Sequence, residues 1–261
     1  MKDHRTKTAG LSLVELSIVL VVIGLLVGSI MTGRSLIRSS QLRTVSTDYY
    51  KYSNAVQLFF NEFNAMPGDM KNATDYWGAA HANATTCITT VGSGITTCNG
   101  NGDGYVNGAG EPFRFWQHLS NAGLIEGKYT GVTDGTYTWS GTAKNVPLGK
   151  IPKSAWFAFS WGITNNYPTF FDGDYHNALQ FGGIVPNSDP SGLVLETAEA
   201  FNIDTKIDDG KPGLGKIRSQ WENCTNASAG NQGATATYLI RETDLRCKLF
   251  TTSIGAETSA N

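Results

Sequence analysis

Residues 10–33 read GLSLVELSIVLVVIGLLVGSIMTG, and the 23 residues that follow Gly10 carry a single charge, on Glu15. A run of roughly 20 apolar residues is long enough to cross a bilayer as a helix. A charged side chain in hydrocarbon costs about 2.5 kcal/mol or more, so an ionisable residue there needs a partner. The stretch therefore predicts a membrane-spanning helix in which the carboxylate of Glu15 has a function.

The start of the chain adds a second signal. Residues 1–10 form a short basic leader that ends in Gly10, and the residues LSLVE and an uncharged run follow. This combination resembles the class III signal of type IV pilins and type II secretion pseudopilins, although that family usually has Phe where this chain has Leu11. The resemblance implies that a prepilin peptidase cuts between Gly10 and Leu11 and methylates the new amine. Glu15 would then be the fifth residue of the mature chain.

The expected cut gives Glu15 a partner. A free amine at Leu11 is a positive charge four residues before the carboxylate, and neither charge is stable alone in lipid. We therefore expect Glu15 to pair with the Leu11 amine of an adjacent subunit and to set the axial register of a helical bundle. The alternatives for this stretch are a plain anchor or a secretory signal peptide, but the latter has a shorter apolar core with its cleavage site after the core.

The helix is expected to continue well beyond the apolar run. Apolar residues recur at spacings of three and four, and the first proline of the chain is Pro67. One continuous helix from about residue 11 to residue 64 follows, with an amphipathic second half. A coiled coil is the alternative, but aromatic residues fit better against a sheet of the same chain. The apolar stripe consists of Leu42, Val45, Tyr49, Tyr52, Val56, Phe59 and Phe63.

The rest of the chain predicts an α+β body. Strands are expected at 136–139, 155–163, 178–185 and 245–251, and helical segments at 112–123 and 193–201. The aromatic residues of 155–163 favour a central strand against the long helix, and residues 72–110 are expected to be irregular. The resulting organisation is a cleaved leader at 1–10, a transmembrane or filament-core segment at 11–33, an amphipathic continuation at 34–64 and a pilin-like globular body with an antiparallel sheet at 65–261.

Charge and cysteine content limit the partners and the compartment. The chain has a formal net charge of −2, which becomes −4 without residues 1–10, so it has no general attraction for nucleic acid. Four cysteines allow three disulfide pairings, and the sequential one, which closes the shorter loops, is expected if the body is exported. Free buried thiols are the alternative. The cysteines are Cys87, Cys98, Cys224 and Cys247.

Residues 99–107 match the first half of a calcium loop. Oxygen-bearing side chains alternate before a glycine in N-x-N-x-D-G, as such loops require. The acid expected at the twelfth position is absent, because Gly110 stands there and Glu111 follows it. The alternative is a glycine-rich turn with local hydrogen bonds. The candidate ligands are Asn99, Asn101, Asp103, the carbonyl of Tyr105, and Asn107.

A second acidic turn lies at 204–210. Asp204, Asp208 and Asp209 resemble the C-terminal acidic turn of some pseudopilins, in which calcium orders a loop. The alternative is a solvated turn with Asp209 and Gly210 at its tip. No cofactor is expected to be required, and calcium is the one candidate.

The sequence favours a structural role. The four histidines have no metalloprotease spacing and no G-x-S-x-G is present, so we expect no enzyme. The resemblance implies a filament subunit held in the bacterial inner membrane, with its body outside the cytoplasm, that later joins a periplasmic or cell-surface filament. Its partners would be copies of itself or related pilins, the prepilin peptidase and the assembly machinery. The alternatives are a pseudopilin or minor pilin of a secretion or DNA-uptake machine, and a membrane-anchored exported binding protein or enzyme.

Overall fold

The computed structural model describes residues 12–108, 110–133, 145–164, 169–186, 188–252 and 254. The chain divides into two compact units, one up to Gln41 and one from Leu42 onward. One helix, α1 (Leu13–Phe63), contributes to both. Gly10, Leu11, the strand expected at 136–139 and the end of the chain at 255–261 lie outside the described residues.

The second half of α1 forms one wall of the core. The apolar stripe is confirmed, since Val45, Tyr49, Tyr52, Val56 and Phe59 are buried and Leu42 and Phe63 pack against them. The helix ends at Phe63, and Asn64 follows in a left-handed conformation with φ of 50°. Asparagine tolerates that conformation better than most residues, so the predicted end of the helix is explained by Asn64 as well as by Pro67.

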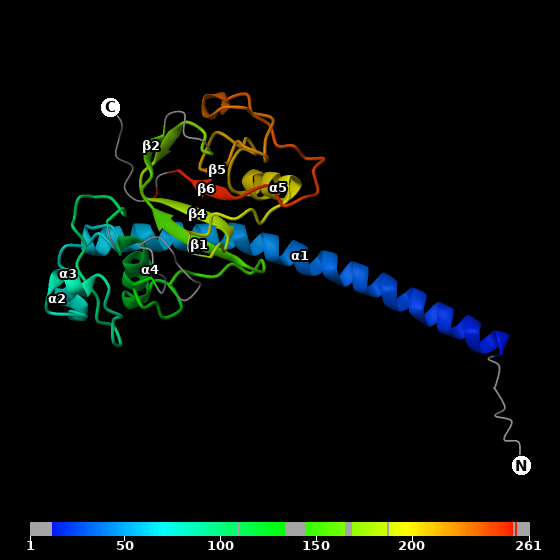
Figure 1. The fold of residues 1–261 in the computed structure, drawn as a ribbon, viewed down its shortest axis with the longest axis horizontal. Coiled ribbons are helices and arrows are strands. Elements are labelled where there is room, and N and C mark those ends of the chain that lie inside the picture. The colour runs from blue at the N-terminus through cyan, green and yellow to red at the C-terminus, as the bar shows by residue number, and fades with distance from the viewer. Residues whose placement is uncertain are drawn as a thin grey trace, which may run out of the picture. The chain divides into compact units, whose positions relative to one another are not determined.

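The described residues of the body form two antiparallel sheets (Figure 1). The larger has the order β1-β4-β6-β5, and the smaller pairs β2 with β3. With α1 packed on this body, the predicted α+β class is confirmed. The strands are β1 (Ser154–Phe159), β2 (Gly162–Thr164), β3 (Gly173–Tyr175), β4 (Ala178–Gly183), β5 (Ile217–Ser219) and β6 (Leu249–Thr251).

The prediction for residues 155–163 was wrong in two respects. The segment forms two strands in different sheets, because Gly162 has a φ of 73° and the chain changes direction there. Among the described strands, β1 is also an outer strand of the larger sheet, paired on its other side only with residues 147–149, whereas β4 and β6 are interior. Its aromatic residues are nevertheless buried, since helices cover it: Trp156 contacts Tyr52 of α1, and Phe157 contacts Phe113 of the short helix α4 (Glu111–Asn121).

The other helices differ from the sequence expectations mainly in their ends. Residues 72–110 contain two short helices, α2 (Ala73–Trp77) and α3 (Ala84–Cys87), in a region expected to be irregular. The helix expected from 193 begins later, as α5 (Thr197–Ile207), because Glu196 and Glu199 form a capping box at its start. A 3₁₀ turn, η1, covers Gly230–Gln232.

Two disulfides tie the irregular parts of the body. Cys87 at the end of α3 joins Cys98, and Cys224 joins Cys247, with Cα–Cα distances of 5.9 and 5.1 Å. This is the sequential pairing. The disulfide ties the segment before β6 to the turn after β5, and the backbone of Cys247 also pairs with Leu195 in the segment before α5.

His118 of α4 connects three segments inside the core. Its Nδ1 accepts the N–H of Gly68 at 3.0 Å, so Nε2 carries the proton and donates to Thr97 Oγ1 at 3.0 Å. Gly68 has a φ of 84°, and a Cβ there would lie 2.5 Å from the carbonyl oxygen of Glu111. Burial disfavours the charged imidazole and lowers the pKa of His118 to about 3.

Replacing Tyr52 tests the α1 stripe. We expect Tyr52→Ala to lower the free energy of unfolding by about 3–5 kcal/mol, because it leaves a large cavity between α1, α4 and β1. Leu58→Ala, on the exposed side of the same helix, should change it by less than about 0.5 kcal/mol. Denaturation of the detergent-solubilised chain, followed by circular dichroism, measures both. Equal losses would contradict the assignment of the buried side.

His118 makes stability depend on acid. Its pKa is lower in the folded chain than the ordinary value of about 6.5 in the unfolded chain, so its contribution is complete above pH 6.5 and is lost as the pH falls toward 3. Between pH 6.5 and 4, the unfolding free energy of the wild type should therefore fall by about 1.4 kcal/mol per pH unit more steeply than that of His118→Gln. Exposed His81→Gln should keep the wild-type slope.

Candidate functional sites

Glu15 takes part in the cap of α1. The backbone N–H of Ser12 donates to Glu15 Oε2 at 2.7 Å, and the N–H of Glu15 donates to Ser12 Oγ at 3.2 Å. This reciprocal pair is a capping box, and it satisfies two amides that the helix leaves without partners. This capping role was not predicted, although its signal, Ser-x-x-Glu, is visible in the sequence. Glu15 therefore has a local role besides any role between subunits.

The cap leaves part of the carboxylate available. Glu15 Oε1 has no hydrogen-bond partner among the residues that the structure describes. The side chain lies in a segment in which none of the described residues 12–41 is buried. By length and composition, α1 is apolar enough there to cross a membrane. An exposed carboxylate oxygen in such surroundings is a strong acceptor for a cationic donor.

The loop at 99–107 is organised by two carboxylates from outside it. Asp69 accepts the N–H groups of Gly102, Asp103 and Gly104 at 2.5, 3.2 and 2.9 Å. Glu111 accepts the N–H groups of residues 101, 107 and 108 at 3.0, 3.1 and 2.6 Å. Both acids are almost fully buried. Asp69 was not predicted to take part, because it lies 30 residues before the loop and no local pattern marks it.

The candidate calcium ligands in this loop bind protein groups. Asn99 Oδ1 accepts the N–H of Thr74 at 2.8 Å, Asn101 Oδ1 accepts that of Asp103 at 2.8 Å, and Asp103 Oδ1 accepts that of Tyr105 at 2.9 Å. These last two are local side-chain turns of the kind that the alternative reading expects. Calcium binding at 99–107, including the Tyr105 carbonyl and Asn107, stays a prediction.

Burial changes the acidity of Asp69. Removal from water disfavours its charged form and raises the pKa of the carboxyl to about 6, even though the N–H groups of Gly104 and Gly102 stabilise the anion. The N–H groups of the loop thus stabilise the buried carboxylate of Asp69.

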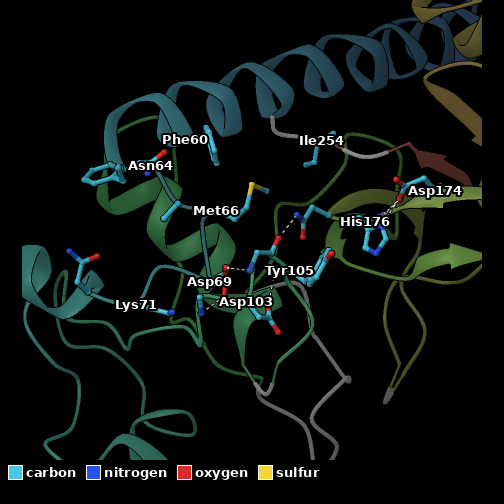
Figure 2. A pocket seen from close by; sticks show the side chains of 16 residues that line it. Phe60, Asn64, Met66, Asp69, Lys71, Asp103, Tyr105, Asp174, His176 and Ile254 are labelled. Atoms are coloured by element: carbon cyan, nitrogen blue, oxygen red, sulfur yellow. Dashed lines mark hydrogen bonds and ion pairs between the residues drawn. The ribbon is translucent and has the colours of Figure 1, made fainter. Parts of the chain in front are cut away.

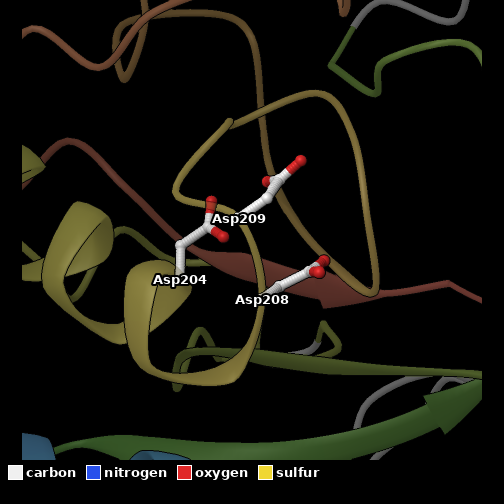
Figure 3. Close-up of side chains that lie close together, drawn as sticks. All are labelled: Asp204, Asp208 and Asp209. Carbon is white, nitrogen blue, oxygen red and sulfur yellow. The ribbon is translucent and has the colours of Figure 1, made fainter.

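The second acidic turn brings its three aspartates together (Figure 3). One carboxylate oxygen from each of Asp204, Asp208 and Asp209 lies within 4.8 Å of the others. Asp204, on the last turn of α5, is fully buried, and its oxygens accept the hydroxyl of Tyr238 at 2.7 Å and the N–H of Gly210 at 3.0 Å. Burial raises the pKa of Asp204 to about 7. A fully solvated turn does not describe this arrangement, because one of its acids is inside the protein.

The geometry of this cluster suits a hard cation. Calcium binds oxygens at 2.3–2.6 Å, so two ligands of one ion are at most about 5 Å apart, and the separations in the cluster fall within that limit. Asp208 Oδ2 is also bonded to the N–H groups of Lys216 and Ile217, which fixes its direction. A cation here would relieve the repulsion between three neighbouring carboxylates.

Thermal melting with and without calcium tests both loops. If the cluster binds calcium, a concentration 100 times the Kd adds about 2.7 kcal/mol of stability and raises the Tm by roughly 5–10 °C relative to EDTA. Asp209→Asn should remove the shift, whereas Asp103→Asn in the other loop should keep it. If Asp103→Asn removes the shift and Asp209→Asn keeps it, calcium binds at 99–107 instead. An unchanged Tm in calcium and EDTA would exclude calcium from both.

Comparison with known proteins found no match. No protein-family model matches the chain, no curated protein matches it, and no solved structure matches it. What the protein does is therefore inferred from its own residues and their placement.

Proposed function

We propose that this chain is a structural subunit of a type IV pilus-like filament, processed after Gly10 by a prepilin peptidase and polymerised through its N-terminal helix. The observation that carries the proposal is the exposure of the first half of α1. Its large aliphatic side chains, from Leu13 through Ile37, are exposed around the helix. A helix that is apolar on all sides needs lipid or other apolar helices around it.

A filament subunit meets both environments in turn. Before assembly the segment lies in the inner membrane, and after assembly copies of it pack together in the filament core. The G-x-x-x-G spacing of Gly24 and Gly28 would let two such helices approach closely, and local unwinding of the helix at these glycines is the alternative. The body lies outside the cytoplasm, which agrees with its two disulfides, since disulfides persist in oxidising compartments.

Glu15 then has two tasks. Within its own helix it caps the amide of Ser12 through Oε2. Between subunits its remaining oxygen, Oε1, accepts the Leu11 amine of a neighbour, so that both charges are neutralised away from water. The two roles are compatible, since they use different oxygens, and the capping box holds the carboxylate at the start of the helix.

The test separates the charge of Glu15 from its capping role. Glutamine can still occupy this position of a capping box, so Glu15→Gln keeps the local contact and removes only the charge. Ser12→Ala removes the hydroxyl that accepts the N–H of Glu15 and keeps the charge of Glu15. In cells with a prepilin peptidase, we expect Glu15→Gln to reduce the subunit in sheared filaments at least tenfold and Ser12→Ala to leave it near the wild-type level. Equal incorporation of wild type and Glu15→Gln would refute the pairing.

The mass of the N-terminus tests processing independently. The mature chain should begin at Leu11 with one methyl group on its amine, and the mass should show both changes together. A purified protein that still begins at Met1 would favour a membrane-anchored binding protein or enzyme. High abundance in sheared filaments would identify a major subunit, and trace amounts a minor pilin or pseudopilin.

A further inference from the structure

A cavity of about 720 Å³ lies within the unit that begins at Leu42. Figure 2 shows side chains from several parts of the chain around it: the end of α1 and the turn after it, the loop at 102–105, the turn between β3 and β4, and Ile254. Its volume falls in the range of small-molecule sites, about 300–1,000 Å³. Filament assembly through the N-terminal helix does not use this cavity.

The cavity has an apolar part and a prepared aromatic surface. Phe60, Met66 and Ile254 supply the apolar part. The ring of Tyr105 packs on that of His176 with centroids 4.7 Å apart, and Tyr105 is still 40% exposed. His176 is itself held by Asp174, whose Oδ1 lies 2.6 Å from Nδ1. The ring of His176 thus supports one side of the tyrosine ring.

The polar groups of the cavity include both donors and acceptors. Asp103 and Asp174 contribute exposed carboxylates, and Asn72 contributes an amide whose side chain has no hydrogen-bond partner among the described residues. Lys71 contributes an ammonium group. Its stem crosses the loop where Gly102 leaves room, since a Cβ at Gly102 would lie 2.1 Å from Lys71 Cε. Asp69 is saturated by loop N–H groups and shapes the wall.

This mixture selects the class of ligand. The carboxylates of Asp103 and Asp174 repel an anion, and the ammonium of Lys71 weakens their attraction for a cation. A neutral molecule with many hydroxyl groups suits the cavity best, because each hydroxyl both donates and accepts. The exposed ring of Tyr105 offers an apolar surface for the C–H face of such a molecule. We propose that this cavity binds a neutral mono- or disaccharide.

The proposal is independent of filament formation, but the two would reinforce each other. A single site of this kind binds weakly, because much of the ligand stays in water. Subunits in a polymer would present one site each at fixed spacing, and simultaneous binding to a glycan surface raises the effective affinity by about 10²–10⁴-fold.

The test uses the full chain in detergent, so it does not depend on assembly. The chain is applied to a glycan array, and retained sugars are then titrated by ligand-observed NMR together with glucose, galactose and N-acetylglucosamine. Choline and citrate serve as cationic and anionic comparison probes. We expect at least one saccharide to bind, and choline and citrate not to bind.

Matched variants locate the site. Tyr105→Ala should weaken saccharide binding by about tenfold, the effect of losing one good aromatic contact. Tyr50→Ala removes a tyrosine that is 45% exposed outside the cavity and should leave binding unchanged. Asn72→Ala should weaken binding without disturbing the fold, since its side chain caps no helix. The proposal is overturned if no saccharide binds, if choline or citrate binds in its place, or if both cavity variants bind like the wild type.

Discussion

The packing of Tyr52 is the contact on which the body depends. Its ring lies edge-on to Trp116 of α4 and to Trp156 of β1, with centroid distances of 5.1 and 5.6 Å. Three elements from distant parts of the sequence therefore meet at one side chain of α1. Edge-to-face aromatic pairs add a directional preference to the burial of large apolar surface. This fixes which side of the helix faces the sheet, and the exposed side follows from it.

The constraint on α1 changes along its length. From Leu42 onward one side of the helix is buried by its own chain, so polar residues can occupy the other side. Up to Gln41 no described residue is buried, and the large aliphatic side chains of this part are exposed. The second half of α1 is thus covered by its own chain, and the first half needs lipid or other apolar helices around it. The proposed filament subunit has this requirement, and so does a membrane-anchored protein.

Buried acids organise the loops of the body in a repeated way. Asp69 and Glu111 collect the N–H groups of the glycine-rich loop, and Asp204 binds Gly210 and Tyr238. A carboxylate can accept several hydrogen bonds, so it can replace a helix or a sheet as the partner of irregular backbone. Burial, together with repulsion from neighbouring acids, raises the pKa values of Asp69 and Asp204, although these hydrogen bonds act in the opposite direction. The loop at 102–105 forms one wall of the cavity, and the turn at 204–210 contains the acidic cluster.

The sequence by itself determined the long helix, its apolar stripe, the α+β class and the position of Glu15, because these follow from local periodicity and from the charge of single residues. It also indicated both acidic turns, since their residues are close in the chain. Only the tertiary structure decided that β1 is an outer strand, that Asp69 reaches the loop at 102–104, and that Asp204 is buried while Asp208 and Asp209 are not. The short strands β3 and β5 were not predicted from the sequence. Three residues carry too little periodicity to be recognised, and their pairing partners are determined by contacts between segments far apart in the chain.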